Sequence, residues 1–257
     1  PALNSARELG KRSVCLGNLK SLQLGWSMYA DSNDEKIIRG EVYDSGPDGT
    51  GSSDYWMGDD MAAGDLFDIQ LLPEELQVAG IRAGALFSYV KNEEAYRCPH
   101  AYREAMRTYS IVDSMRGMAR QGTSTGSGSS RRGVKVGNTT LWITNRMEIT
   151  SPAPDSRIVF LDTGKPQDDS FATHYVNEQW WDPISSRHGD GTTFSFADGH
   201  GEYWKWIGAK TLSNSKIFPP TSAQHNLQPE SQEDYKDLYR FQRAVWGRLG
   251  YTPTHQL

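Results

Sequence analysis

Hydrophobic positions between residues 9 and 30 recur mostly at steps of three, four and seven. The residues of this stripe are Leu9, Leu16, Leu19, Leu22, Trp26, Tyr29 and Ala30. Such spacing places side chains along one side of an α-helix, and the polar residues between them fall mostly on the other side. The polar run at 31–34 prefers local side-chain bonds to the backbone over continued helix. We therefore predict one long amphipathic helix from near Pro1 to about Asp31.

The start of this helix has two interpretations. Ser5 is followed three residues later by Glu8, which matches a capping box and would be a true helix start. The preceding residues Pro1-Ala2-Leu3 are apolar enough to continue a helix that begins upstream. The sequence leaves both interpretations open.

Short apolar or alternating runs predict strands in the middle of the chain. Arg157–Leu161 is apolar enough to be central in a sheet, and Leu141–Ile143 is a second candidate. Residues 95–98 suggest a short strand that ends at Pro99, because proline cannot donate to a strand ladder. Residues 39–64 are rich in Gly, Asp and Ser, which indicates loops around short strands.

The best-formed local signal is a hairpin from Thr192 to Trp206. Two alternating segments flank the pair Asp198-Gly199. Asp-Gly supplies the positive φ angles of a type I′ turn, whose twist suits paired strands. Aromatic side chains of the two strands would then stack across the pair and stabilise the sheet. They are Phe194, Phe196, Trp204 and Trp206.

Other segments divide into helix and loop. Pro73–Val90 looks helical, with Gly80 and Gly84 splitting it into two pieces. Residues 117–137 contain a Gly/Ser/Thr tract without apolar anchors, which predicts an exposed, mobile loop. Residues 208–229 are expected to form irregular coil.

A closing helix is predicted at 231–249. Ser231 and Asp234 are placed to cap its first turn, and apolar and aromatic residues recur along one side. Gly250 is expected to terminate it, since glycine adopts the left-handed conformation that ends helices.

Charge and hydropathy exclude two classes of partner. The chain has 27 Lys and Arg against 32 Asp and Glu, a formal net charge of -5, and the basic residues are scattered. It therefore has no basic face to neutralise phosphates, and nucleic acid is not an expected partner. No run approaches the roughly 18 apolar residues that would span a bilayer, so the chain as it stands is expected to be soluble.

Metal ligands are sparse in the sequence. The two cysteines, Cys15 and Cys98, are too few for a zinc site and are not spaced as a redox pair. They could form one disulfide or remain two buried free thiols, and the cellular compartment decides between these. Asp31, Asn33 and Asp34 could offer oxygens to calcium, but the late glutamate of a calcium loop is absent, which favours a polar turn. No metal or cofactor is predicted.

A hydrolase is a weak interpretation of the polar residues. His188 and Asp198 could join a serine in a catalytic triad, yet Asp198 is already explained by its turn. Gly122–Gly126 formally matches the nucleophile-elbow pattern around Ser124, but its flanks are polar where the elbow needs a strand and a helix. No reaction is assigned.

Four tryptophans suggest an alternative function. Their flat rings could form an aromatic surface for sugar, as in an extracytoplasmic carbohydrate-binding or surface-recognition module. Core packing is the commoner use of such residues, so exposed rings would favour binding and buried rings would favour packing. They are Trp180, Trp181, Trp204 and Trp206.

Three separated parts of the chain carry a family resemblance. They are Pro1–Glu8 with Cys15–Leu22 and Met28–Asp34; Gly84–Asn92 with Tyr96–Pro99; and His188, which nine residues separate from Asp198-Gly199. In order and spacing these segments resemble the bacterial pilin-like proteins known as prepilin-type processing-associated H-X9-DG proteins, which are relatives of type II secretion pseudopilins. The leader and the apolar first half of the family's helix have no counterpart here.

The resemblance implies a pseudopilin-like structural subunit or accessory of a type II secretion or type IV pilus-like machine, without enzymatic activity or cofactor. The chain would be the soluble part of a protein anchored in the inner membrane, with its body in the periplasm or at the cell surface. Its N-terminal helix would contact other pilin-like subunits. In that oxidising setting a Cys15–Cys98 disulfide is favoured. His188, Asp198 and Gly199 would then be structural.

We therefore predict one α+β domain over residues 1–257. Its long N-terminal helix, residues 1–31, packs on an antiparallel β-sheet in a pilin-like manner. The β-rich body covers 32–206, and 207–257 form a C-terminal extension with the closing helix.

Overall fold

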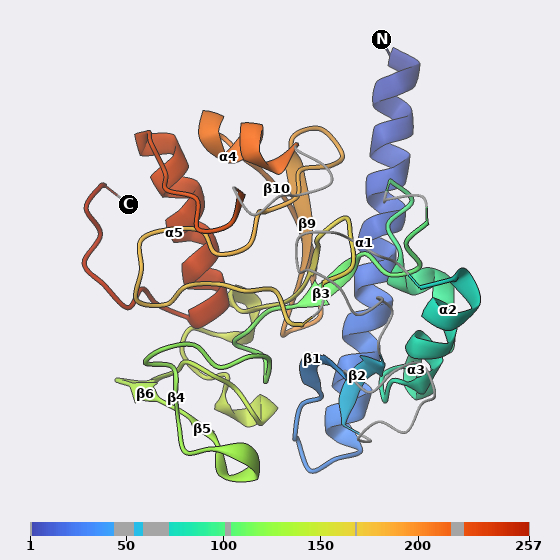
Figure 1. Cartoon of the computed structure of the whole chain (residues 1–257), viewed down its shortest axis with the longest axis horizontal. Coiled ribbons are helices and arrows are strands. Elements are labelled where there is room, and N and C mark those ends of the chain that lie inside the picture. The colour runs from blue at the N-terminus through green and yellow to red at the C-terminus, as the bar shows by residue number, and fades with distance from the viewer. Residues whose placement is uncertain are drawn as a thin grey trace.

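The long helix is the first element of the fold. The computed structural model describes residues 2–43, 54–58, 72–100, 104–167, 169–216 and 224–256. Helix α1 (Ala2–Asp31) contains 30 residues, and its N-terminal turns extend beyond the rest of the molecule (Figure 1). Because Ser5 already lies inside α1, the predicted capping box at Ser5 and Glu8 does not start the helix.

A four-stranded antiparallel sheet forms the centre of the body. Its strands are β3 (Tyr109–Ile111), β8 (Ile158–Asp162), β9 (Gly191–Phe196) and β10 (Gly201–Lys205). Their order is β10-β9-β8-β3, and every neighbouring pair is antiparallel. All five residues of β8 are buried between β9 and β3, which confirms the predicted central strand. Helix α1 packs against β8, β9 and β10, so the predicted α+β fold is confirmed.

Both faces of the sheet are covered, by α1 on one side and α5 (Gln232–Trp246) on the other (Figure 1). Successive side chains of a strand point to opposite faces. Ser195 of β9 accordingly bonds Gln23 of α1, while Phe194 packs on Phe241 of α5 with ring centroids 6.2 Å apart. All six residues of β9 are therefore buried although the strand alternates in polarity.

The hairpin of β9 and β10 is confirmed, but its turn differs from the prediction. The N–H of Gly199 donates to the carbonyl of Phe196 at 2.9 Å, and Phe196 N–H donates to His200 O at 3.0 Å. The loop thus has three residues, and within it Gly199 (φ 101°) has positive φ while Asp198 does not. This is a type I turn followed by a left-handed glycine, not a type I′ turn.

The closing helix α5 begins as predicted. Ser231 accepts from Asp234 N–H, and Asp234 reaches back to the N–H of Ser231, which forms a complete capping box. The helix ends at Gly247 (φ 80°), three residues before the predicted terminator. Before it, α4 (Ala209–Ser215) replaces part of the irregular coil predicted at 208–229.

The predicted helix Pro73–Val90 is divided once. Helix α2 (Glu74–Ala83) contains Gly80, and α3 (Phe87–Val90) follows a break at Gly84. A Cβ on Gly84 would lie 2.2 Å from both the Cα of Met57 and the carbonyl oxygen of Trp56, so this close approach requires glycine.

Several short elements complete the fold. The prediction of a strand at 95–98 is wrong, because the 3-10 helix η1 (Glu93–Tyr96) occupies the first half of this segment. The strand predicted at Leu141–Ile143 is found two residues earlier, as β7. The tract 117–137 is largely exposed, but it contains a small hairpin of β4 and β5. The remaining bounds are β1 (Arg39–Tyr43) and β2 (Tyr55–Gly58), which pair in parallel; β4 (Ser124–Thr125); η2 (Gly128–Ser130); β5 (Arg132–Gly133); β6 (Lys135–Val136); β7 (Thr139–Thr140); η3 (Arg146–Glu148); and η4 (Pro154–Ser156).

Candidate functional site

Helix α1 has apolar residues on two opposite faces. Cys15, Leu19, Leu22 and Trp26 are fully buried against the body. Large apolar side chains on the other side are exposed by 42 to 62%, and they are Leu9, Val14, Leu24 and Met28. Since successive helical residues turn by about 100°, Leu9 lies about 100° from Trp26 around the axis. Its predicted place on the buried stripe is therefore wrong.

The exposed face has the spacing of a coiled-coil contact. Six exposed residues follow one another at steps of four, three, four, three and four: Gly10, Val14, Gly17, Ser21, Leu24 and Met28. We call this row the outer seam. A repeat of 3.5 residues keeps one seam facing a partner helix. Apart from the neighbouring backbone of α1 itself, no heavy atom of the described chain would lie within 4 Å of a Cβ added at Gly10 or Gly17, so the backbone there is open to close approach. A search for hydrophobic residues alone misses this row, because three of its six positions are glycine or serine.

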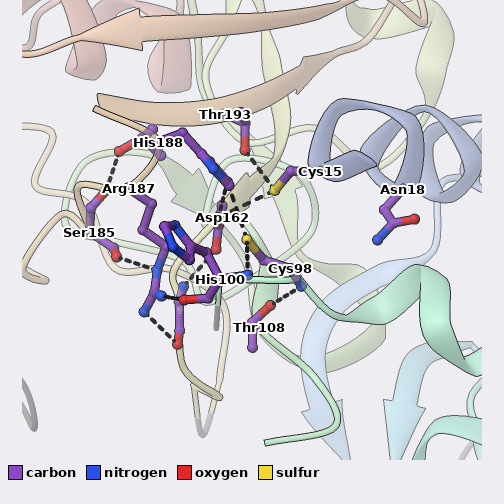
Figure 2. A network of polar contacts seen from close by, with 12 residues as sticks. Cys15, Asn18, Cys98, His100, Thr108, Asp162, Ser185, Arg187, His188 and Thr193 are labelled. Carbon is purple, nitrogen blue, oxygen red and sulfur yellow. Dashed lines mark hydrogen bonds and ion pairs between the residues drawn. The ribbon is translucent and has the colours of Figure 1, made fainter. Parts of the chain in front are cut away.

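A second candidate site lies where α1 meets the sheet. It contains Cys15 of α1, Cys98 after η1, Asp162 at the end of β8, and His188 in the loop before β9 (Figure 2). All four side chains are buried, and one Sγ, carboxylate oxygen or ring nitrogen from each lies within 4.8 Å of the others. We call these four residues the buried cluster. The sequence singled out three of them, whereas Asp162 had no local signal beyond its place after an apolar strand.

Polar contacts surround each sulfur. The Sγ of Cys15 lies 3.1 Å from the hydroxyl of Tyr109 and 3.3 Å from that of Thr193, and its thiol donates to Asp162 Oδ2 at 3.4 Å. The Sγ of Cys98 lies 3.3 Å from His188 Nε2. His188 Nε2 is also 3.9 Å from Asp162 Oδ2.

The second sulfur and the carboxylate are held by backbone groups. The N–H of His100 donates to Cys98 Sγ at 3.4 Å, and the N–H of Gly164 donates to Asp162 Oδ1 at 2.9 Å. The second oxygen of Asp162 therefore points toward the sulfurs and the imidazole. These contacts direct the Cys98 sulfur and the second Asp162 oxygen toward one common centre (Figure 2).

The loop before β9 directs His188 into the cluster. His188 (φ 54°), Gly189 (φ 90°) and Asp190 (φ 69°) are all left-handed, and Arg187 and Gly191 exchange two backbone hydrogen bonds across them. Left-handed conformations are uncommon for residues other than glycine, and their strain concentrates at functional sites. The Arg187 guanidinium donates to Gly164 O at 2.9 Å and thereby ties this loop to the end of β8.

The surroundings of Cys98 and His188 favour the neutral forms of the thiol and the imidazole. A hydrogen bond with Cys15, burial and the Asp162 carboxylate raise the pKa of the Cys98 thiol. Burial lowers the pKa of His188, although the Asp162 carboxylate opposes this. A thiol with a raised pKa is a poor nucleophile. The Cys98 thiol is therefore not activated as a nucleophile.

The predicted disulfide is not formed in this structure. Cys15 and Cys98 are both free and buried. The structure nevertheless brings the two sulfurs into one cluster from segments 83 residues apart in sequence. Formation of the bridge remains a prediction.

The two ends of the H-X9-DG motif lie at opposite ends of β9. Six strand residues separate the loop of His188 from the turn of Asp198 and Gly199, a span of about 20 Å at roughly 3.3 Å per residue. Asp198 Oδ1 instead lies 2.6 Å from Nδ1 of His200. The triad of His188 and Asp198 is therefore not formed, and Asp198-Gly199 form the hairpin turn as predicted.

The tryptophans do not form an exposed platform. Trp180, Trp204 and Trp206 are buried, and Trp181 alone is partly exposed. Trp180 packs on Phe241 with ring centroids 5.4 Å apart, and the Trp204 and Phe194 centroids are 4.7 Å apart. The predicted aromatic binding surface is wrong, because strand alternation directs Trp204 toward α5 and Trp180 packs on Phe241 of the same helix.

A cleft of about 560 Å³ borders the buried cluster. Glu8 and His100 line it together with His188. His100 Nδ1 lies 3.2 Å from Glu8 Oε2, and its ring stacks on that of His188 with centroids 5.4 Å apart. His100 thus lies between the cluster and the surface.

Comparison with known protein families, with curated proteins and with solved structures finds no match to this chain. Among the described residues, no helix combines the length and the apolar character needed to cross a membrane.

Proposed function

We propose that this protein is a non-enzymatic, pseudopilin-like structural subunit of a type II secretion or type IV pilus-like machine, anchored in the inner membrane with its body outside the cytoplasm. In such an assembly α1 packs beside the α1 helices of other pilin-like subunits. The observation that carries the proposal is the outer seam, which lies opposite the face of α1 that packs on the sheet.

The geometry of α1 supports lateral packing. The helix is about 45 Å long at 1.5 Å per residue, and its first turns project past the body (Figure 1). A single helix contributes four of the exposed large apolar side chains of the described chain, including Leu24 at 62%. Full burial of each such side chain contributes about 1.5 to 3 kcal/mol. Contact with a neighbouring helix would therefore remove an unfavourable exposed surface.

The alternative carbohydrate-binding function required an exposed aromatic surface, which the structure does not have at these tryptophans. Three of its four tryptophans stabilise the core between the sheet and α5. We therefore propose the structural function alone.

The test joins two copies of the chain by a parallel two-stranded coiled coil placed before Ala2, in register with the outer seam. This linkage replaces the high local concentration that a membrane anchor supplies. Ser21→Cys, within the seam, is expected to form an interchain disulfide efficiently under mild oxidation. Lys11→Cys, about 80° away from Ser21 around the helix axis, is the matched control and is expected to crosslink weakly.

A second pair of variants separates seam packing from nonspecific association. Leu24→Glu should abolish the Ser21→Cys crosslink, because it places a charge inside the helix contact. Met147→Glu changes an exposed apolar residue outside α1, 70% exposed, and should leave the crosslink intact. Equal crosslinking at positions 21 and 11, or no crosslink at position 21, would refute the proposal.

A further inference from the structure

The buried cluster has the dimensions of a tetrahedral metal site. Zinc lies about 2.3 Å from cysteine sulfur and about 2.0 to 2.2 Å from histidine nitrogen or carboxylate oxygen, so its ligand atoms are about 3.3 to 3.8 Å from one another. Three of the six separations in the structure are 3.3 Å for Cys98 Sγ and His188 Nε2, 3.4 Å for Cys15 Sγ and Asp162 Oδ2, and 3.9 Å for Asp162 Oδ2 and His188 Nε2. All four ligand atoms lie within 4.8 Å of one another, so small side-chain shifts would bring them to the distances of a zinc site.

The donor set selects the kind of ion. Two thiolates and an imidazole favour a borderline-soft ion such as Zn²⁺, whereas magnesium and calcium prefer oxygen ligands alone. A carboxylate is an accepted fourth ligand of zinc. Two cysteines are therefore sufficient here, because the fold supplies a histidine and an aspartate that are 64 or more residues away from Cys98 in sequence.

The groups around the cluster fit a second ligand shell. Hydroxyls of Tyr109 and Thr193 contact Cys15 Sγ, and the N–H of His100 donates to Cys98 Sγ. Donors of this kind stabilise thiolate charge, and outer contacts of ligands typically orient a metal site. The Gly164 N–H occupies Asp162 Oδ1 and leaves Oδ2 directed at the cluster.

We propose that Cys15, Cys98, Asp162 and His188 bind one zinc ion in a closed, structural site. All four positions are filled by the protein, so the site has no open position for a substrate. Cys15 is the ligand from α1, and the other three come from the body. The ion would therefore fix the long helix to the sheet.

Zinc binding and the Cys15–Cys98 disulfide exclude each other. Zinc replaces the thiol protons, so binding releases protons and weakens as the pH falls. A disulfide would remove both thiolates by oxidation. The thiol state of the protein therefore decides between the two.

The direct test uses the complete chain, purified without chelators and under conditions that preserve thiols. About one zinc per chain is expected by elemental analysis. Two reactive thiols should appear only after denaturation with a chelator. Replacement of zinc by Co²⁺ should give the thiolate-to-cobalt charge-transfer band and the intense visible bands of a tetrahedral ion. These spectra are measured on the unmodified protein and do not depend on the folding of a variant.

Variants then assign the ligands. Cys98→Ser and His188→Asn should each weaken cobalt affinity by more than about tenfold, and asparagine tolerates the left-handed backbone of residue 188. His100→Ala removes a neighbouring ring that is not one of the four ligands, and His200→Ala is a remote control. Both should retain the tetrahedral spectrum.

Three results would overturn the proposal. One is a chain that fails to bind added zinc or cobalt although both thiols are free. Another is a Cys15–Cys98 disulfide that persists in protein expressed and purified under thiol-preserving conditions. The third is loss of the metal in His100→Ala but not in Cys98→Ser, which would place the ion on the group of Glu8, His100 and His188 at the cleft.

Discussion

The packing of α1 on the sheet predicts that alanine substitutions at two leucines five residues apart will have very different effects on stability. Leu19 is fully buried on the sheet side, and Leu24 is 62% exposed in the outer seam. Truncation of a buried leucine to alanine costs about 2 to 5 kcal/mol, because apolar contacts are lost and a cavity remains. We expect Leu19→Ala to lower the free energy of unfolding by about 3 kcal/mol. For a domain of this size that corresponds to a decrease in Tm of about 6 to 12 °C.

Leu24→Ala is the matched control because it makes the same chemical change on the same helix. Its effect should stay within about 0.5 kcal/mol, since it removes little buried surface and alanine favours helix. Urea denaturation followed by tryptophan fluorescence and by circular dichroism would measure both variants at a concentration where the chain is monomeric. A cost below about 1 kcal/mol for Leu19→Ala, or equal costs for the two variants, would show that α1 does not pack on the sheet through this face.

Three further predictions test caps, close contacts and a buried acid. Ser231→Ala should destabilise the protein by about 1 kcal/mol in urea denaturation because the α5 cap is lost, whereas Ser127→Ala should have little effect because Ser127 makes no side-chain cap bond. Gly84→Ala should lower Tm through its 2.2 Å clashes, while Gly10→Ala, with open space around it, should raise Tm slightly in the monomer through helix propensity. Burial raises the pKa of Asp237 to about 6, against backbone N–H donors that lower it. Its folded pKa therefore exceeds its unfolded value, so the stability that Asp237 contributes is present at low pH and is lost as the pH rises through about 6. Asp237→Asn should remove this part of the pH dependence of the free energy of unfolding. An unchanged pH profile in the variant would contradict the assignment.

Features governed by local periodicity were predictable. The spacing of apolar residues predicted α1 and its end at Asp31, and the capping box at Ser231 predicted the start of α5. The Asp198-Gly199 pair predicted the position of the hairpin, because glycine there has a positive φ that other residues avoid. Each signal depends on residues within one or two turns of chain.

The sequence-based predictions were wrong where contacts with residues distant in sequence determined burial, helix ends or turn type. The sequence left a binding surface as an alternative to core packing for Trp204 and Trp206, and only the covering of that face of the sheet by α5 decided for the core. Gly80 and Gly84 looked alike in sequence, yet Gly80 lies inside α2 and the helix ends at Gly84, where an added Cβ would lie 2.2 Å from the backbone of β2. The type of turn at Asp198 depended on strand register, which is also a nonlocal property.

By itself the sequence determined the main elements, the α+β class and the buried side of α1, because hydrophobic periodicity and capping residues act locally. Tertiary structure alone decided which polar residues meet. Cys15, Cys98, Asp162 and His188 come from four segments, and their convergence depends on the packing of α1 on β8 and β9. It also decided that the second face of α1 is left uncovered, since a row of small and apolar residues becomes a surface only when the rest of the chain packs elsewhere.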